Sequence, residues 1–399
     1  MTSTADYPQP RATGCPFDPP PGARGIGAPV TRVRSWDGST PWLVTRYEDQ
    51  RAALADPRVS ADSTLPGYPS TSPGIAARRS RARTFIAMDD PEHARLRRMV
   101  TAPFAVKRVE ALRPAVQRIV DDLIDGMLAG PKPVDLVTAF ALPVPSLVIC
   151  ALLGVPYEDH EFFQENSRVL VHRDTTPEEG VAAQERLIGY LDGLVQRKLA
   201  DPADDLLSEL ATRRVATGEL TRREAAVLGQ LMLVAGHETT ANMIALGTLA
   251  LLEHPDQLAL LRETEDPKLV AGAVEELLRY LTIVHLGRRR VALEDIEIGG
   301  RTIRAGEGLI LANDLGNRDG TQFADPDRLD VRRDARRHIA FGFGVHQCLG
   351  QPLARVELQV VYGTLYRRIP ALRLATGLDR VRFKHDGAVY GVYELPVTW

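Results

Sequence analysis

Apolar residues recur at helical spacing over most of the chain that follows residue 90. This period predicts helices over residues 91–127, 181–200, 221–253 and 266–280. Strand-like runs are short, and they fall at residues 42–44, 296–298, 302–303 and 308–311 and in the tail near 389–397. The pattern therefore predicts a mainly α protein with small, separate β-sheets.

The segment 221–253 is the longest of these predicted helices. It opens with Thr221 and Glu224, which have the spacing of a capping box, and it stops before Pro255. About 33 residues at a rise of about 1.5 Å span roughly 50 Å. Because the segment is apolar almost all round, we expect it to run through the core.

A polar cluster interrupts the middle of this helix. The run 235–240 reads AGHETT and combines a glycine, a carboxylate and two hydroxyls. Gly236 weakens the helix by about 1 kcal/mol relative to alanine, and Thr239 and Thr240 can bond the carbonyls one turn back. One interpretation is a bend whose polar groups satisfy one another. The other is a groove where a ligand meets the backbone and protons are relayed.

The stretch 136–156 is apolar enough to raise the question of a membrane span. Pro143 and Pro145 would break a spanning helix, and the apolar run after them is far shorter than the roughly 20 residues that a bilayer requires. We therefore predict a buried helix, in which Cys150 is a small core residue.

Composition narrows the possible classes of protein. The chain is 44% hydrophobic and carries a net charge of −3, which is typical of globular proteins and unlike a general nucleic-acid binder. Cys15, Cys150 and Cys348 are too few and too scattered for a disulfide framework, and the N-terminus has no secretory pattern. We therefore expect a cytoplasmic protein without a membrane anchor.

The length of 399 residues alone suggests two or three domains, but no linker, repeat or charge block divides the chain. We expect a single domain over residues 1–399 with an irregular arm over residues 1–30, where Cys15 is an incidental thiol. Residues 60–83 form a second irregular stretch, rich in Pro, Ser, Gly and Arg. A loop of that length is typical of an active-site lid.

A glycine-rich run carries the last cysteine. Residues 341–350 read FGFGVHQCLG, and a helix is expected to start directly afterwards, with Pro352 in its first turn. Cys348 then lies near the N-terminus of that helix, where a thiolate is stabilised and can bind iron. The alternatives are a structural cysteine and half of a zinc site with His346, for which no second pair of ligands is nearby.

A third cluster is the run ELLR at residues 276–279. Glu276 and Arg279 share one helix face, where they form an ordinary ion pair if the helix is solvated. By itself this pair indicates no function.

Taken together and in this order, the three clusters resemble the motifs of the cytochrome P450 family. The matching runs are AGxETT at 235–240, ExxR at 276–279 and FGxGxHxCxG at 341–350. The run 89–98 also resembles a helix start of the family, and the resemblance covers essentially the whole chain. It implies the P450 fold, with haem buried between the long central helix and the helix that follows the cysteine loop. In its length and in the absence of a membrane anchor, the sequence resembles bacterial members of the family, those of actinomycetes in particular.

The resemblance implies haem b as cofactor, with Cys348 as the thiolate ligand of its iron. Phe341 would pack near this ligand, and Gly342, Gly344 and Gly350 would let the loop form. The cations implied for the two haem propionates are His93, Arg97, His346 and one arginine of the run 288–290. Spacing favours Arg290 and leaves Arg289 as the alternative. Glu276 and Arg279 would form a buried structural pair.

On the opposite side of the haem, the resemblance implies that Ala235 and Gly236 border the site of dioxygen, with Gly236 opening the groove. Glu238 and Thr239 resemble the acid–alcohol pair that delivers protons to dioxygen. His237 receives no role. Outside the lid, the expected substrate pocket consists of Leu233, Val234, Ile283, Val284, Val389 and Tyr390.

Electrons must come from outside the chain, because it contains no flavin or nicotinamide fingerprint. The resemblance implies an iron–sulfur ferredoxin and its reductase, and Arg98 and Arg355 are the expected contacts. The expected activity is that of a monomeric monooxygenase, which inserts one atom of O2 into a lipophilic small molecule. Hydroxylation or epoxidation of a macrolide, polyketide, steroid-like or xenobiotic compound would fit.

Two other functions compete with this one. The first is a haem-thiolate protein that binds or senses without turnover, and the second is a peroxide-driven peroxygenase. The pair Glu238 and Thr239 argues against both, because sensing needs no proton relay and such peroxygenases tend to lack the pair.

Overall fold

The computed structural model describes residues 4–12, 14–25, 27–78 and 83–399, and this part of the chain is mainly helical. The helices are α1 (Pro21–Arg24), α2 (Tyr47–Ala55), α3 (Pro73–Arg78), α4 (Glu92–Thr101), α5 (Val106–Ala129), α6 (Pro143–Leu153), α7 (His160–Val171), α8 (Pro177–Ala200), α9 (Leu206–Leu210), α10 (Arg222–Leu252), α11 (Pro255–Glu263), α12 (Pro267–Leu281), α13 (Asn313–Gly316) and α14 (Gln351–Arg368). The strands are β1 (Ala5–Asp6), β2 (Val30–Arg34), β3 (Trp42–Val44), β4 (Val59–Ser60), β5 (Val134–Asp135), β6 (Arg288–Ala292), β7 (Ile296–Ile298), β8 (Arg301–Ile303), β9 (Gly308–Leu311), β10 (Arg373–Leu374) and β11 (Pro396–Thr398).

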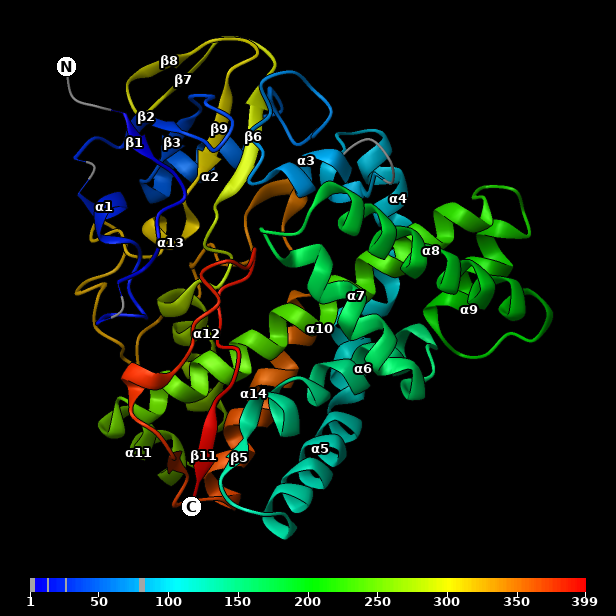
Figure 1. Ribbon diagram of the computed structural model, residues 1–399, viewed down its shortest axis with the longest axis vertical. Helices are drawn as coiled ribbons and strands as arrows, with labels where there is room; N and C mark the ends of the chain where they lie inside the picture. The colour runs from blue at the N-terminus through cyan, green and yellow to red at the C-terminus, as the bar shows by residue number, and fades with distance from the viewer. Residues whose placement is uncertain (1–3, 13, 26, 79–82) are drawn as a thin grey trace.

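The strands form three separate sheets. The largest has the order β1-β2-β3-β9-β6-β4, and the smaller ones are β10-β11-β5 and β7-β8. The largest sheet and β7-β8 lie on one side of the molecule, whereas α5, α6, α8 and α9 lie on the other (Figure 1). The prediction of a mainly α protein with small separate sheets is therefore confirmed.

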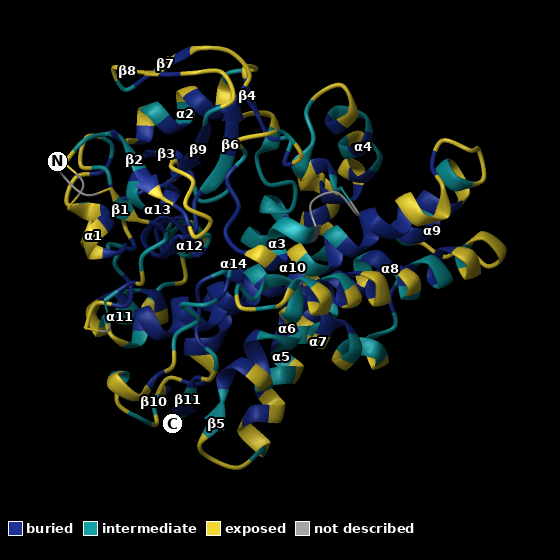
Figure 2. Ribbon diagram, turned by 45° about the horizontal axis from the view of Figure 1, so that its top comes forward, coloured by how far each residue is buried: buried dark blue, intermediate teal, exposed yellow. Residues whose placement is uncertain are grey.

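Helix α10 forms the centre of the core, as its all-round apolar sequence predicts. The side chain of Thr221 accepts from the backbone N–H of Glu224, and Glu224 accepts from the backbone of Thr221, which is the expected capping box. The helix packs against α6, α8 and α14. Most residues of α10 are buried, whereas Figure 2 shows exposed residues along outer helices such as α8 and α9.

The prediction of one helix over 91–127 is wrong. Helix α4 ends at Thr101, a 3-10 turn occupies Ala102–Phe104, and α5 begins at Val106. Pro103 lies in that turn, and it has no N–H with which to continue the α-helical ladder. The chain therefore changes direction between two helices that share one apolar period.

Helix α8 starts four residues before the predicted 181, at Pro177. Its first turn is polar and was therefore invisible to the apolar pattern. Thr176 and Glu179 form a second capping box there, with proline at the first helical position. This signal was present in the sequence.

Strands β3, β7, β8 and β9 lie where the sequence predicts them, whereas the two longer strands β2 and β6 and the two-residue strands β1, β4, β5 and β10 were missed. Strand β6 reads RRRVA, so three charged residues hide its alternation. In the tail, the stretch predicted near 389–397 is largely irregular, and the strand is confined to Pro396–Thr398.

The apolar stretch at 136–156 is a buried helix, as predicted. Pro143 opens α6, after a π-helical turn at Val137–Ala141, and Cys150 lies in the core. Within the described residues, no helix is both long enough and apolar enough to cross a bilayer.

The two stretches predicted to be irregular contain short elements. In the N-terminal arm, β1 pairs in parallel with β2, and α1 forms a single turn. In the predicted lid, α3 packs against α8. Residues 79–82 of the lid lie outside the described part.

Candidate haem site

The cysteine loop folds around two glycines in the left-handed region. Gly342 has φ +77° and Gly344 has φ +71°, and a Cβ at Gly344 would collide with the carbonyl oxygen of Leu54. The backbone N–H of Cys348 donates to the carbonyl of Phe341 at 2.9 Å, which closes the loop. Gly350 has an ordinary φ of −78°. Of these three glycines, Gly342 and Gly344 adopt a backbone conformation that favours glycine, whereas Gly350 does not.

The thiol of Cys348 lies directly before α14, which begins at Gln351. Burial raises the pKa of this thiol, whereas Arg288, the backbone N–H of Gly350 and Arg97 act to lower it. An anion at the sulfur would thus meet a backbone donor and two cations. The ring of Phe341 lies beside the loop, with the Arg355 guanidinium 4.7 Å from its centroid.

Four residues predicted to hold the haem propionates come together at this loop from distant parts of the chain. The rings of His93 and His346 are 4.1 Å apart, and Arg97 donates to the Gln347 carbonyl at 2.7 Å. Burial and the nearby Arg290 lower the pKa of His346 to about 3. His93 Nε2 and His346 Nδ1 are buried without a hydrogen-bond partner among the described residues. Such nitrogens fit an anionic group like a haem propionate.

Strand alternation separates the three arginines of β6. The charge of Arg290 lowers the pKa of the nearby His346. Arg288 lies against the cysteine loop, where its Nη2 donates to the Ala340 carbonyl at 3.1 Å. Arg289 points to the opposite face, near Tyr7. The geometry thus favours Arg290 over Arg289 and adds Arg288 to the cations of the site. Alternation along the strand could have identified Arg288, had β6 been recognised.

The polar cluster of α10 leaves the helix intact. Thr239 Oγ1 donates to the Ala235 carbonyl at 2.7 Å, as the one-turn spacing predicts. Ala235 is exposed although the residues around it on this helix are mostly buried, so α10 borders an open space here. Gly236 differs from expectation, because its missing side chain faces α6. A Cβ there would lie 2.8 Å from Ile149, so the glycine permits close helix packing rather than opening a groove.

Glu238 is the buried acid of this cluster and it has two unexpected partners. Its Oε1 accepts from Lys384 Nζ at 3.2 Å and from Asn242 Nδ2 at 3.0 Å. Burial raises the pKa of Glu238, but Lys384, His237 and the hydrogen bond from Asn242 together lower it by more, so the pKa lies below its ordinary value. Asn242 follows Glu238 by one helical turn and could have been found from the sequence. Lys384 is 146 residues away and gave no signal.

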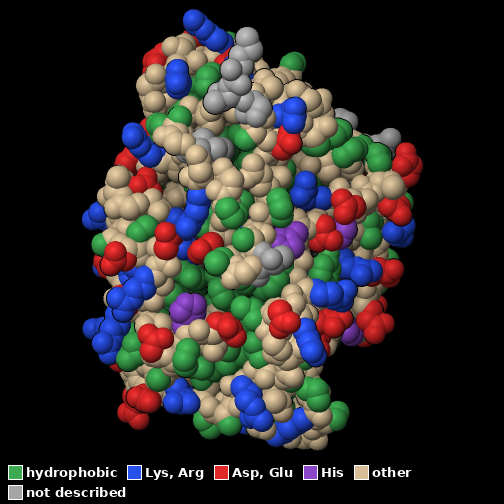
Figure 3. Space-filling model, turned by 60° about the vertical axis from the view of Figure 1, so that its left-hand side comes forward, with side chains coloured by type: hydrophobic (Ala, Val, Ile, Leu, Met, Phe, Trp, Pro, Cys, Tyr) green, Lys and Arg blue, Asp and Glu red, His purple; other side chains and the backbone are tan. Residues whose placement is uncertain are grey.

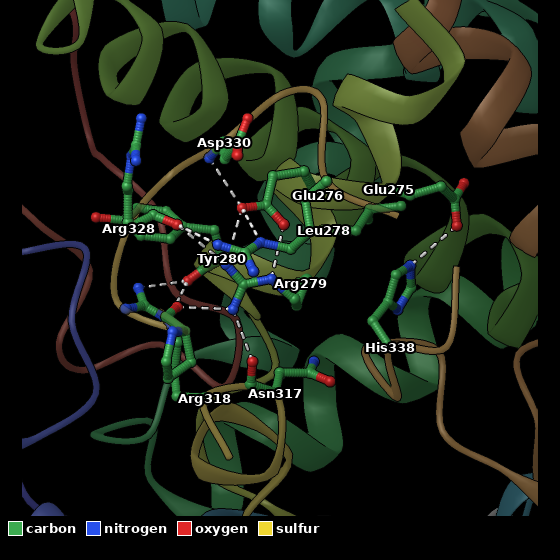
Figure 4. Close-up of polar contacts among 12 residues, drawn as sticks. Glu275, Glu276, Leu278, Arg279, Tyr280, Asn317, Arg318, Arg328, Asp330 and His338 are labelled. Carbon is green, nitrogen blue, oxygen red and sulfur yellow. Dashed lines mark hydrogen bonds and ion pairs between the residues drawn. The ribbon is translucent and has the colours of Figure 1, made fainter. Parts of the chain in front are cut away.

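Glu276 and Arg279 form a completely buried pair. Two parallel hydrogen bonds of 2.7 and 2.8 Å join them, and Arg279 also donates to the carbonyls of Asn317 and Pro326. Figure 4 shows this network, in which the backbone N–H of Asp330 also reaches Glu276. Arg333, missed in the sequence, donates to Glu276 at 3.1 Å. The pair therefore fixes the segment before the cysteine loop onto α12.

The predicted pocket residues fall into two groups. Leu233 and Tyr390 are fully buried, and Ile283 is nearly so. The partly exposed members are Val234, Val284 and Val389. The backbone N–H of Tyr390 donates to the Ile283 carbonyl at 2.8 Å, so the tail lies against the segment after α12.

The two arginines expected to meet a ferredoxin differ. Arg98 is exposed. Arg355 is held by Glu275 in two hydrogen bonds of 2.7 and 2.9 Å, and Glu275 also contacts His338 at 3.1 Å. The Arg355 guanidinium is therefore already paired with a carboxylate, whereas Arg98 is in no such pair among the described residues. Over the face drawn in Figure 3, basic and acidic side chains are intermingled, in keeping with the net charge of −3.

The other two cysteines lie as expected, and the zinc alternative for Cys348 finds no support among the described residues. Cys15 is exposed, and burial raises the pKa of Cys150 to about 12. Among the described residues, the only trio of side chains placed to share a metal ion is His172, Asp174 and Asp386. Neither Cys348 nor His346 belongs to it, which argues against the zinc site.

Comparisons with known proteins agree with this geometry. The cytochrome P450 family model matches residues 66–369. Cytochrome P450 GfsF of Streptomyces halstedii is 58% identical over 99% of this chain and 96% of its own length. Cytochrome P450-SU2 of Streptomyces griseolus is 59% identical over 98% and 96%. The crystal structure of mycinamicin VIII C21 methyl hydroxylase from Micromonospora griseorubida, bound to mycinamicin VIII, superposes with a TM-score of 0.93 at 44% identity, over 99% of this chain and all of that one. The chain therefore belongs to the cytochrome P450 family and is a monooxygenase that binds haem b.

Proposed function

We propose that Cys348 is the thiolate ligand of haem b and that His93, Arg97, Arg290 and His346 hold its propionates. The observation that carries this proposal is the pair of buried, unpartnered nitrogens, His93 Nε2 and His346 Nδ1, beside the cysteine loop. Carboxylates at these atoms would satisfy both, and charge-assisted bonds of this kind are the stronger ones. Arg288 adds a third guanidinium next to the loop.

Haem b with a thiolate ligand activates dioxygen, so that one oxygen atom enters the substrate and the other leaves as water. In this proposal Thr239 holds a proton on the side of α10 that borders the open space at Ala235. Glu238 passes protons to that position from the side of the helix where Lys384 lies. Glu276 and Arg279 take no part in the chemistry and stabilise the segment that carries the cysteine loop.

The ligand assignment is tested with carbon monoxide and the reduced holoenzyme. We expect the strongly red-shifted Soret band of a thiolate-ligated haem in the wild type and its loss in Cys348→Ala. Cys150→Ala is the matched control, since that thiol is buried in the core away from the loop. A red-shifted band that persists in Cys348→Ala would exclude Cys348 as the ligand.

We further propose that the substrate is a lipophilic small molecule of secondary metabolism. The activities for which relatives are named support this class, since they include a mycinamicin VIII C21 methyl hydroxylase, a pentalenic acid synthase and a vitamin D3 dihydroxylase. The side chains expected to meet it are the partly exposed Val234, Val284 and Val389. Screening such compounds for shifts of the ferric Soret band would identify binders, and product analysis would separate hydroxylation from epoxidation.

We propose that an acidic iron–sulfur ferredoxin delivers the electrons and that Arg98 contacts it. Arg98 is exposed on the helix that also carries His93 and Arg97. An ion pair in such a docking site acts mainly on the rate of association. We expect Arg98→Glu to slow reduction by ferredoxin at low salt, and Arg197→Glu, an exposed change on α8, to leave it unchanged. Equal rates in the two variants would remove Arg98 from the interface.

A further inference from the structure

Arg289 lies on the face of β6 that is turned away from the cysteine loop. Its Nη2 reaches the carbonyl of Gly287 only at a long 3.4 Å. Its Nε is buried without a hydrogen-bond partner among the described residues. Burial lowers the pKa of this arginine, and the neighbouring Arg173 lowers it as well. A guanidinium in this position has more donors than the described chain satisfies.

Arg173 approaches the same place from the loop between α7 and α8. Its backbone N–H donates to the Asp386 carbonyl at 2.8 Å, and the adjoining His172 forms an isolated bridge with Gly387. His172 Nε2 also contacts the carboxylate of Asp386 at 3.0 Å. The loop is thereby attached to the tail. Arg173 Nε is buried and, like Arg289 Nε, has no partner within the described residues.

Further buried polar atoms lie in this part of the molecule, those of Tyr7 close to the two arginines and those of Tyr390 and His385 close to Arg11. The hydroxyls of Tyr7 and Tyr390 and the Nδ1 of His385 are buried and have no partner among the residues described. Tyr7 lies near enough to Arg289 and Arg173 for both charges to lower the pKa of its hydroxyl. Native structures contain few such atoms, and the three that lie together at Arg289, Arg173 and Tyr7 indicate a ligand.

The acids nearby do not satisfy these donors. The carboxylate of Asp386 accepts from the hydroxyl of Tyr393 at 2.6 Å and contacts His172. Burial raises the pKa of Asp314, and the nearby Arg11 opposes this effect. The Arg11 guanidinium donates to the carbonyls of Phe17, Leu281 and Thr282. Arg173 and Arg289 therefore remain without a carboxylate in an ion pair among the described residues.

This cationic group adjoins the region expected to hold the substrate. The ring of His285 lies 5.3 Å from that of Tyr390, and its Nε2 is 3.0 Å from the carbonyl of Gly387. Tyr390 in turn donates to Ile283 through its backbone. An anion at Arg173 and Arg289 would thus lie beside the residues expected to meet the substrate.

We propose that Arg289 and Arg173 bind the carboxylate of a lipophilic carboxylic acid and so determine substrate specificity. This inference rests on the proposed monooxygenase function and narrows its substrate class. Guanidinium groups suit this role, since their planar donors match the two oxygens of a carboxylate. The arginines hold one end of the molecule, while its apolar part extends past Ile283 and Val389.

The test uses the ferric holoenzyme and a panel of lipophilic carboxylic acids, from straight-chain to polycyclic, each paired with its methyl ester. Soret titrations give the dissociation constant of both members of each pair. We expect several acids to bind at least about tenfold more tightly than their esters, the range typical of a hydrogen bond to a charged group. Arg289→Gln and Arg173→Gln should bring this ratio close to one without changing ester binding.

Three controls make the outcome decisive. Arg289→Lys should retain part of the preference, and Arg197→Gln on α8 should retain all of it. Acetate should not shift the Soret band, because it lacks the apolar part. The proposal is overturned if no acid in the panel outbinds its ester, or if Arg289→Gln keeps the preference. Failure of the underlying haem-thiolate assignment would be distinct, since the carbon monoxide band would then be absent in the wild type.

Discussion

Lys384 donates to Glu238 across 3.2 Å and thereby joins the C-terminal tail to the middle of α10. Both side chains are mostly buried, with 19% and 11% exposure. Neither a helical period nor a short motif connects the two positions. The acid expected to relay protons is therefore held by a cation from a distant part of the chain.

We expect Lys384→Met to destabilise the holoenzyme at neutral pH by about 1–3 kcal/mol, because Glu238 stays buried with Asn242 as its remaining partner. The lowered pKa of Glu238 means that the pair stabilises the fold above the ordinary carboxylate pKa, and that this contribution is lost as the pH falls through the lowered value. Without Lys384 the pKa of Glu238 rises. The difference in free energy of unfolding between the wild type and Lys384→Met should therefore become smaller at acidic pH. Urea unfolding at several pH values measures this.

The matched control for this pair is the double variant Lys384→Met with Glu238→Gln. It removes both charges, and it should recover much of the stability that Lys384→Met loses. If the double variant is no more stable than Lys384→Met, then the loss comes from packing and the ion pair is not its cause.

Breaking the Glu276–Arg279 pair should have a larger effect. Both side chains are 0% exposed, and Arg279→Ala would leave a buried carboxylate whose remaining partners among the described residues are Arg333 and the Asp330 N–H. We expect a loss of about 3–5 kcal/mol and a low yield of haem-loaded protein. Arg336→Ala, in an exposed pair with Asp334, should leave the stability close to that of the wild type. Equal losses in the two variants would contradict this difference.

The sequence drew attention to those residues of the candidate site that lie close together along the chain. Cys348 with its glycines, Glu276 with Arg279, and Glu238 with Thr239 each lie within one loop or one helical turn, so spacing alone brought them to attention. Arg333, Glu275 and Lys384 reach the same regions through the tertiary fold. No periodicity could have found them.

The fold was predictable in a similar way. Helix α10 was placed within one residue at each end, because a capping box and a proline mark its ends. The break at Pro103 was missed because the apolar period runs through it, although the proline itself was a signal. Strand β6 was missed because it begins with three arginines, which obscure the alternation of a strand.

Gly236 provides a test of close packing between α10 and α6. A Cβ at this position would lie 2.8 and 2.9 Å from two atoms of the Ile149 side chain. We expect Gly236→Ala to destabilise the protein by about 1–3 kcal/mol, since overpacking outweighs the gain in helix propensity. Thermal unfolding of the holoenzyme measures the change.

Shortening the opposing side chain should relieve this clash. In the double variant Gly236→Ala with Ile149→Ala, the loss should be smaller than the sum of the two single losses. Strict additivity would show that Ile149 is not the obstacle, and that the glycine serves the open side of the helix after all.

Thr239 is the hydroxyl on which the proton relay depends. Its only side-chain hydrogen bond within the described part of the chain is the one it donates to the Ala235 carbonyl, so Thr239→Ala should leave α10 and the carbon monoxide band intact. We expect the yield of product per NADPH to fall at least about tenfold, with the electrons recovered as hydrogen peroxide, because positioned proton transfer contributes at least that much to rate. Thr239→Ser keeps the hydroxyl and should restore coupling, whereas the neighbouring Thr240→Ala should leave coupling near that of the wild type. Tight coupling in Thr239→Ala, measured with ferredoxin, reductase and a bound substrate, would assign the relay to another group.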